Sequence, residues 1–398
     1  TQMIGRLEIL RFLSNFAFKL KLPVMNPFIV IVVFIHTLVN AYLFVRGWQA
    51  LPASVPVRIV YGLIFLLFYG SFFIAMAGRD SFPLDRQKAL YFIGSTWFAF
   101  MLYLSLYFVF TDIIHLADRF FRFLPSSLSP VVFRQVQVIS GYILVIIILA
   151  AGHYRFTHPE IVEKTININK NGGKYNELKA VVISDLHLGT GIGKKMLQQY
   201  VQLVNAQNPD IILIAGDMID SNVRPLEEER MYEEINRMEA PLGIYFCPGN
   251  HEYITGIDRS LHFFAKTKME VLIDSAVCVN GSFWVIGRND RTNHNRLSLK
   301  QLVSKTVPEQ PLFLLDHQPY FPEEAAVCGI DLQISGHTHD GQLWPLNYIV
   351  GGMYELGHGY LKKKDTHLIV TSGLGIWGPQ FRVGTQSELI ILNIRFKE

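Results

Sequence analysis

Five short motifs of acidic, histidine and amide side chains occur in the second half of the chain, each directly after an apolar run. They read Asp-Leu-His at 185–187, Gly-Asp-Met-Ile-Asp at 216–220, Gly-Asn-His-Glu at 249–252, Asp-His at 316–317 and Gly-His-Thr-His at 336–339. Carboxylate, amide and imidazole donors without thiolate suit Mn, Fe, Zn or Ni. There are too many donors for one tetrahedral ion and enough for two. The motifs therefore predict a site for a pair of divalent metal ions.

Each motif alone is weak evidence. An Asp-x-His triplet arises by chance in many proteins, and an isolated His317 or Asn250 is more often a hydrogen-bonded loop residue. The Gly-Asp and Gly-His pairs also suit ordinary turns. All five motifs occur together, however, and each follows a predicted strand, so coincidence is the weaker explanation.

Short buried strands are the elements that must position these motifs. We expect them at residues 180–184, 211–215, 243–247, 311–315 and 332–335. The carboxyl ends of neighbouring strands in an open α/β sheet converge on one crevice, where such folds bind ligands. The five motifs are therefore expected to meet at a common point.

The second half of the chain predicts an α/β domain. Helical periodicity at residues 194–205, 226–239 and 259–266 alternates with the early strands, and Asn280-Gly281 indicates a later hairpin. Strands that alternate with helices and then form hairpins indicate layers with mixed sheets. We place this domain at residues 179–398 and interpret the polar stretch 153–178 as a linker.

The composition limits the class of protein. Hydrophobic residues make up 50% of the 398 residues and charged residues 17%, which excludes a disordered chain. A net charge of +3 gives no reason to expect a nucleic-acid partner. The three cysteines form no Cys-x-x-Cys pair, which argues against a disulfide framework or a thiolate zinc site.

The first part of the chain predicts a membrane domain. Four apolar stretches, at residues 27–45, 59–77, 89–110 and about 136–152, approach the roughly 20 residues needed to cross hydrocarbon. None of them contains Asp, Glu, Lys or Arg. Buried helices of a soluble core are the alternative, but four such stretches in succession favour four transmembrane helices.

Residues 7–20 predict an amphipathic helix before these spans. Their apolar side chains fall largely on one helical side, which suits a helix in the headgroup plane or a helix packed on the bundle. Residues 1–152 would then form one N-terminal membrane domain. Basic residues in short loops slightly favour a cytoplasmic position for both termini and hence for the catalytic domain.

The region from residue 179 to the C-terminus resembles the calcineurin-like metallophosphoesterases, because it carries Asp-x-His, Gly-Asp-x-x-Asp, Gly-Asn-His-Glu, a single His and Gly-His-x-His in order. The resemblance implies a four-layer α/β/β/α sandwich, here preceded by four transmembrane helices. Ser-Gly-Leu-Gly at 372–375, with Arg382 and Glu388, is more weakly similar to the membrane-associated bacterial phosphodiesterase branch. That branch implies a location in the bacterial inner membrane.

The resemblance also implies a role for each matching residue. One ion would be held by Asp185, His187 and His339, the other by Asn250, His317 and His337, and Asp217 would bridge both. His251 would contact the substrate phosphate and act as the general acid, with Asp220 orienting it.

Phosphoester hydrolysis is the chemistry that such a site performs. Two cations about 3.5–4 Å apart can hold the attacking and leaving oxygens of an in-line displacement at phosphorus and lower the pKa of a shared water. The bridging hydroxide would attack, and His251 would protonate the leaving oxygen.

One departure from the family narrows the substrate. Its protein serine/threonine phosphatases carry an Arg directly after the second Asp of Gly-Asp-x-x-Asp, where this chain has Ser221. Phosphodiesters or pyrophosphates are therefore expected rather than phosphoproteins. Loop position makes Asn222, Lys194, Lys195 and Arg382 candidates for substrate contact, whereas the three lysines at 362–364 are interpreted as a solvated turn.

These observations predict a membrane-anchored phosphoesterase with two divalent metal ions that acts on a phosphoester substrate, for which a lipid headgroup is one candidate. A lipid-precursor, sugar-nucleotide pyrophosphatase is one specific form of this hypothesis. A non-catalytic membrane receptor or scaffold with the same fold is an alternative, as is a transporter with an attached hydrolase. The complete set of metal ligands argues against the former, and the lack of charged residues inside the spans argues against the latter.

Overall fold

The computed structural model describes residues 27–123 and 129–397 of the chain. The predicted amphipathic helix at 7–20 lies outside the described residues. The chain divides into two compact units, Thr1–Tyr61 with Leu104–Ile139, and Gly62–Tyr103 with Ser140–Glu398. The first half of the long helix α4 (Leu84–Phe121), up to Tyr103, thus belongs to the same unit as the α/β domain. The predicted domain boundaries at 152 and 179 stay a prediction.

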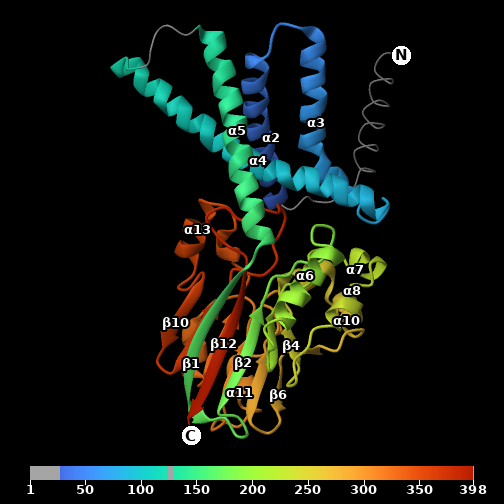
Figure 1. Cartoon of the computed structure of the whole chain (residues 1–398), viewed down its shortest axis with the longest axis vertical. Coiled ribbons are helices and arrows are strands. Elements are labelled where there is room, and N and C mark those ends of the chain that lie inside the picture. The colour runs from blue at the N-terminus through green and yellow to red at the C-terminus, as the bar shows by residue number, and fades with distance from the viewer. Residues whose placement is uncertain (1–26, 124–128, 398) are drawn as a thin grey trace, which may run out of the picture. The chain divides into compact units, whose positions relative to one another are not determined.

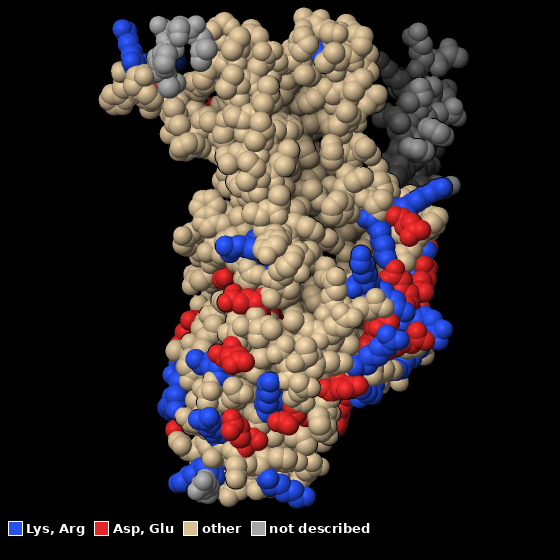
Figure 2. Space-filling view, viewed as in Figure 1, with Lys and Arg blue, Asp and Glu red and all other residues tan. Residues whose placement is uncertain are grey.

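Four long apolar helices confirm the four predicted spans. They are α2 (Pro27–Ala50), α3 (Val55–Ala77), α4 (Leu84–Phe121) and α5 (Pro130–Thr157). All four are long and apolar enough to cross a membrane. Only 17–28% of each apolar window is buried, which fits helices that face lipid and contradicts the alternative of a soluble core. On the face seen in Figure 2, these helices show few charged side chains, whereas the α/β domain shows both signs.

Two six-stranded mixed sheets form the framework of the α/β domain (Figure 1). The first sheet has the order β1-β12-β2-β3-β4-β5, and the second has the order β10-β11-β9-β8-β7-β6. The strands of the first sheet are β1 (Glu160–Asn171), β12 (Glu388–Lys397), β2 (Glu177–Ile183), β3 (Ile211–Ala215), β4 (Ile244–Cys247) and β5 (Glu270–Val271). Those of the second are β10 (Gly359–Lys363), β11 (Thr366–Val370), β9 (Leu332–Ser335), β8 (Leu312–Leu315), β7 (Phe283–Gly287) and β6 (Ser275–Val279).

Alternate residues of the central strands pack into different cores. Val182 of β2 and Phe313 of β8 belong to one core, which lies between the two sheets. Val181 and Leu312 point the other way, into cores that the helices cover. Helices α6 (Lys194–Asn205), α7 (Arg224–Glu228), α8 (Met231–Ile235) and α10 (Ile257–Phe264) cover the first sheet, and α11 (Leu299–Val303) and α12 (Pro322–Val327) cover the second.

These cores confirm the predicted four-layer α/β/β/α sandwich. Because the central strands are buried on both faces, their sequences are continuous apolar runs such as Ile-Ile-Leu-Ile-Ala in β3. The predicted strands at these positions agree with the structure to within a few residues.

The stretch predicted as a linker, 153–178, is mostly ordered structure in the same domain. Helix α5 continues to Thr157, and β1 begins at Glu160 and pairs in parallel with β12. The prediction of a linker missed this strand because β1 lies at the edge of its sheet and buries little more than Ile166 and Ile168. Apart from the partly buried Val162, the other side chains of β1 are polar or exposed, so its composition resembles that of a loop.

The predicted helix at 226–239 is broken. Helices α7 and α8 are separated at Arg230, whose φ of 52° lies in the left-handed region. Part of the stretch predicted as a lysine turn belongs to strand β10, which ends at Lys363. The turn itself lies at Lys364, whose φ is 52°. Helices α9 (Asn250–Thr255), α11 and α12 are too short for helical periodicity to reveal them, and α13 (Leu346–Met353) lacks an alternation of polar and apolar faces.

Candidate metal centre

The structure brings the five motifs together at the carboxyl ends of β2, β3, β4, β8 and β9. Strands β2, β3 and β4 are parallel neighbours in one sheet, and β8 and β9 are parallel neighbours in the other. Where the chain leaves these strands, several motif residues have positive φ. This backbone conformation turns side chains two positions apart toward the same side. The residues are Asp185, His187, Asp217, His337 and His339. Positive φ is uncommon for residues other than glycine and marks a backbone that its surroundings hold in place.

The first group of ligand atoms comes from Asp185, His187 and His339. The Nε2 atoms of His187 and His339 are 3.0 Å apart, and Oδ1 of Asp185 lies 3.7 and 3.5 Å from them. Ligands held about 2.1 Å from one ion lie about 3.0–3.4 Å from one another. One of the three distances lies in this range and the other two exceed it by 0.1–0.3 Å, so small shifts would let the three atoms hold a single cation.

The second group comes from Asp217, His317 and His337. His317 Nδ1 lies 2.7 Å from the carbonyl oxygen of Ala215, to which it donates a hydrogen bond. This bond keeps a proton on Nδ1, so Nε2 is the ring atom that can give up its proton and bind a metal ion, and Nε2 lies 3.0 Å from Oδ2 of Asp217. A backbone hydrogen bond that fixes the ring of a ligating histidine is typical of metal sites.

Asp217 faces both groups. Its Oδ2 atom, which is close to His317, also lies 3.9 Å from Nε2 of His187 in the first group. Burial opposes the ionisation of Asp217, but the positive charge of His317 outweighs it and holds the pKa of this carboxyl well below its usual range. An ionised carboxylate between two ligand groups is the arrangement that a bridging ligand needs.

Asn250 is the remaining predicted ligand and begins helix α9. Its Oδ1 atom is buried and has no hydrogen-bond partner among the described residues. A buried acceptor without a donor is costly, which makes a missing ligand a reasonable explanation for it. The Gly249 that precedes it could not carry a side chain, because a Cβ there would collide with Oδ1 of Asp217. The glycine of the motif thus permits the close approach of the two loops.

His251 lies beside the two groups without belonging to either triad of predicted ligands. Its ring meets that of His187 edge to face at 4.5 Å, and its Nδ1 atom lies 2.5 Å from the backbone carbonyl oxygen of Asp220. Burial lowers the pKa of His251, but the hydrogen bond to Asp220 and the charge of Asp217 outweigh it and raise this pKa to about 9. The ring is therefore protonated near neutral pH.

Asp220 contacts His251 chiefly through its backbone. Its carboxylate Oδ1 is 3.4 Å from Nδ1 of His251 and 3.8 Å from Nδ1 of His187. We predicted that the carboxylate orients His251. In the structure the shorter contact is to the carbonyl oxygen, and the carboxylate lies between two imidazole rings.

Glu252 supports the centre and has no role in the sequence-based prediction. It is fully buried, and its Oε2 accepts hydrogen bonds from the N–H groups of Gly249 and Asp217, at 2.7 and 3.1 Å. Its Oε1 accepts from the N–H of Ile219 at 3.0 Å. Burial and the charge of Asp217 raise the pKa of Glu252 to about 7. The final Glu of Gly-Asn-His-Glu was the available signal.

Arg382, a candidate for substrate contact by its loop position, is fully buried and bonded within the protein. Its guanidinium donates to the carbonyl oxygens of His339, Ser372 and Gly375 at 2.7, 2.6 and 2.9 Å. Burial lowers its pKa to about 10, so it remains charged at neutral pH. Arg382 therefore joins the loop of one predicted ligand to the loop that follows β11.

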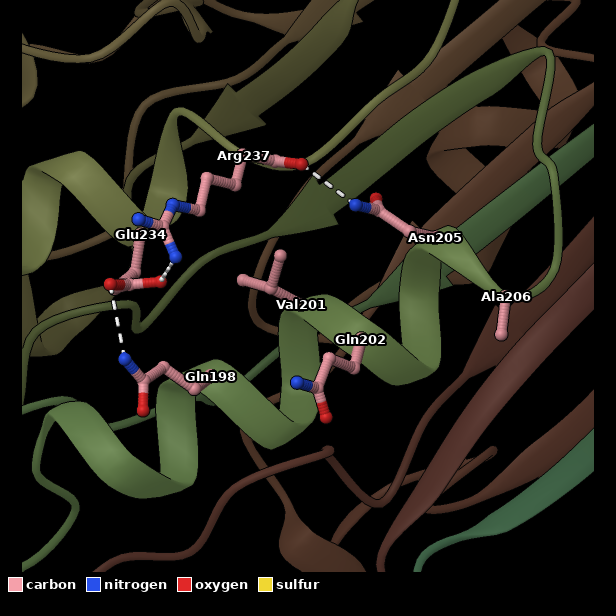
Figure 3. Close-up of a pocket in the computed structure, with 7 residues that line it drawn as sticks. All are labelled: Gln198, Val201, Gln202, Asn205, Ala206, Glu234 and Arg237. Atoms are coloured by element: carbon pink, nitrogen blue, oxygen red, sulfur yellow. Dashed lines mark hydrogen bonds and ion pairs between the residues drawn. The ribbon is translucent and has the colours of Figure 1, made fainter.

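The lysine and asparagine candidates for substrate contact are also engaged elsewhere. Lys194 lies 3.7 Å from Glu234, and Asn222 donates to Asp80 at 3.4 Å. Figure 3 shows a surface pocket beside α6, lined by residues that include Gln198, Asn205 and Arg237. None of the predicted site residues lines this pocket, and its polar groups bond to one another, so it is distinct from the candidate centre.

Comparisons with known proteins agree with this geometry. The family described as calcineurin-like phosphoesterase matches residues 178–341, a range that contains every predicted metal ligand. A metallophosphoesterase of Campylobacter jejuni is 28% identical over 389 residues, which cover 92% of this chain and 98% of that protein. One of Aquifex aeolicus is 30% identical over 260 residues, which cover 63% of this chain and 98% of that protein.

A relative from Danio rerio is named a transmembrane protein with metallophosphoesterase domain. It is 32% identical over 256 residues, which cover 60% of this chain and 58% of that protein. The family match, the relatives and the arrangement of Asp, His and Asn side chains lead to one assignment: the chain belongs to the calcineurin-like metallophosphoesterases.

Proposed function

We propose that this protein is a membrane-anchored phosphoesterase that uses two divalent metal ions to hydrolyse phosphodiester or pyrophosphate bonds. The observation that carries the proposal is the position of Asp217, whose Oδ2 lies 3.0 Å from His317 and 3.9 Å from His187. One carboxylate oxygen thus faces two separate groups of ligand atoms, as a site for an ion pair requires.

The residues present fit such a pair of ions. Asp185, His187 and His339 would hold one, Asn250, His317 and His337 the other, and Asp217 would bridge them. The donors are oxygen and imidazole nitrogen, which suits Mn, Fe, Zn or Ni. When bound, these cations would offset the charge of the phosphoester and lower the pKa of the attacking water.

His251 supplies the proton in this proposal. Water gives up one proton to solvent and attacks phosphorus as hydroxide, a new P–O bond forms, the P–O bond to the leaving group breaks, and Nε2 of His251 gives its proton to the departing oxygen. The carbonyl oxygen of Asp220 holds the other ring proton at Nδ1. This contact directs Nε2 away from Asp220, and the raised pKa of His251 keeps it protonated before the reaction.

The membrane helices support a substrate carried by the membrane. Only two residues separate the end of α5 at Thr157 from the start of β1 at Glu160, so the domain stays close to the membrane surface. We propose a phospholipid headgroup or a lipid-linked precursor such as a sugar-nucleotide pyrophosphate as substrate. We further propose that the domain lies on the cytoplasmic side of a bacterial inner membrane, because basic residues slightly favour that side.

The test uses the full chain purified in detergent, stripped of metal and resupplied with Mn²⁺. We expect hydrolysis of bis-p-nitrophenyl phosphate that requires the metal and falls by at least about 100-fold in Asp217→Asn. Asp258→Asn is the matched control, because Asp258 is exposed at the start of α10. Full activity of Asp217→Asn, or no activity of the wild type with any of the four metals, would refute the proposal.

A further inference from the structure

Helix α13 presents an apolar surface on the α/β domain. None of its eight residues is buried, and the exposed fractions of Tyr348, Ile349 and Met353 are 71%, 58% and 62%. Residues 341–354 contain no Asp, Glu, Lys or Arg. Soluble proteins expose single apolar side chains commonly but seldom a contiguous group without charges, so this surface calls for a partner.

The surface lies at the end of a membrane span. The N–H of Trp344, just before α13, donates to the carbonyl oxygen of Val383 at 2.7 Å. The next residue back, Arg382, donates its N–H to the carbonyl oxygen of Gly152 in α5 at 2.9 Å. Gly152 ends the uncharged apolar stretch of α5, so it marks the membrane boundary. All these residues belong to one compact unit, which places α13 beside this boundary.

A loop bound to the segment before α13 carries another exposed aromatic side chain beside the candidate metal centre. Gln342 donates its side-chain N–H to the carbonyl oxygen of Trp377 at 2.9 Å. The Trp377 side chain is 54% exposed, and its ring centroid lies 6.2 Å from that of His251. On the other side, α13 packs against the turn that carries His339. Exposed apolar side chains therefore lie both beside the end of the span and at the edge of the metal centre.

We propose that this surface inserts into the headgroup region of the membrane that the chain itself spans. We call it the apolar rim, and it consists of Trp344, Leu346, Tyr348, Ile349, Met353 and Trp377. Two tryptophans and a tyrosine suit this position, because their rings combine apolar faces with a polar N–H or O–H group. The lack of charges avoids the cost of desolvating them. A phospholipid bilayer is thus the partner that the chemistry of the rim favours.

This inference goes beyond the proposed function, because it concerns where the domain rests and not what it hydrolyses. If the rim inserts, the metal centre opens at the level of the lipid headgroups. A phosphoester in a headgroup would then reach the centre without leaving the bilayer.

The test measures the depth of a spin label at Ile349 or Met353. Each is replaced by Cys in the full chain, in a background in which the partly exposed Cys278 and Cys328 are Ser, while Cys247 stays buried. The labelled proteins are reconstituted in nanodiscs of phosphatidylcholine and phosphatidylglycerol. Collisions of the label with oxygen, which partitions into lipid, are compared with collisions with a water-soluble nickel chelate.

Val307→Cys is the matched control, because Val307 is apolar, 44% exposed and distant from α5. The N–H of Gln310 donates to the carbonyl of Val307, and Lys170 near the end of β1 donates to the carbonyl of Gln310. Lys170 lies ten residue steps along the extended strand from Glu160, which corresponds to about 33 Å. The control label should therefore meet water.

We expect labels at 349 and 353 to collide at least about threefold more often with oxygen, relative to the nickel chelate, than the label at 307. Equal ratios at all three positions would overturn the proposal. Protection from both reagents would also overturn it, since the rim would then be covered by protein, either a second copy or residues 1–26. None of these outcomes depends on catalysis, so a failure of the hydrolysis assay leaves the depth measurement valid.

Discussion

The Nε2 atoms of His187 and His339 lie 3.0 Å apart although 152 residues separate them in the sequence. Two neutral imidazoles that both direct lone pairs into one small space repel each other, unless a proton or a cation lies between them. Burial lowers the pKa of His339 well below its usual value, which disfavours a proton on that ring. A cation between the two rings would satisfy both lone pairs at once.

Metal should therefore stabilise the protein. Adding Mn²⁺ to the stripped protein at about 100 times its Kd should raise the free energy of unfolding by about 2.7 kcal/mol. His339→Ala should weaken Mn²⁺ binding at least about tenfold, because it removes one of the ligands at the first position. Titration calorimetry and thermal unfolding in detergent measure both effects. His262→Ala, at an exposed position of α10, should bind Mn²⁺ like the wild type.

His251→Ala should reduce the rate according to the leaving group. General acids typically contribute about 10²–10⁴-fold, and mainly when the leaving oxygen is basic. We expect losses near that range for an alkyl phosphodiester and smaller losses for bis-p-nitrophenyl phosphate, whose leaving group needs no proton. Measuring kcat for both substrates tests this role. Equal losses on both would instead assign His251 to positioning of the phosphate.

Glu252→Gln should destabilise the centre by about 1–3 kcal/mol. The substitution replaces one carboxylate oxygen by an amide NH₂ group, which cannot accept the hydrogen bond that a backbone N–H donates in the wild type. The affected donors are those of Asp217, Ile219 and Gly249. Chemical unfolding with and without Mn²⁺ measures the loss, which should be accompanied by weaker metal binding. Glu239→Gln, on an exposed side chain, should change neither quantity.

Arg382→Met should cost about 3–5 kcal/mol, since it leaves buried carbonyl oxygens without a donor. Its three shortest hydrogen bonds go to His339, Ser372 and Gly375. Arg395→Met removes an arginine whose side chain is 60% exposed and should stay within about 0.5 kcal/mol. If the two variants unfold at the same temperature, Arg382 does not support the ligand loop.

The pair of His358 and Glu388 should make stability depend on pH. His358 Nε2 lies 3.1 Å from both carboxylate oxygens of Glu388, and this hydrogen bond raises the pKa of His358 above 6.5. Asp340, at 3.9 Å, adds to the rise, whereas burial and Arg382 oppose it. A raised histidine pKa contributes stability that is fully present below pH 6.5 and is lost as pH rises through the higher value.

Protonation of Glu388 removes this stabilisation at low pH. Burial raises its pKa, but His358 outweighs burial and lowers it below 4.5, so stability is lost as pH falls through that lowered value. Melting temperatures of the wild type and His358→Gln should therefore differ most in weakly acidic buffer and converge at high pH. A constant difference across this range would contradict the predicted linkage.

The motifs and their convergence on one site could be predicted from the sequence because each motif follows a buried strand. Strands such as β3 are buried on both faces, so their continuous apolar runs are visible in the sequence. Polar residues that follow such runs must lie at the ends of the strands, and parallel neighbours bring those ends together. The same reasoning holds for β8 and β9 in the second sheet.

The supporting residues could not be predicted in the same way. Arg382 donates a hydrogen bond to the carbonyl oxygen of His339, which precedes it by 43 positions. No spacing rule connects a buried arginine to so distant a backbone group. Edge strand β1 has the composition of a loop because one face remains polar. Helix α13 is apolar on all sides and only eight residues long, so periodicity does not reveal it.

The order β1-β12-β2 also constrains how the domain assembles. Strand β12 fits between two strands that precede it by more than 200 positions, parallel to β1 and antiparallel to β2. During synthesis, β1 and β2 emerge soon after α5 and remain unjoined until β12 leaves the ribosome. The first sheet is therefore completed late, and until then its open edges need protection from aggregation.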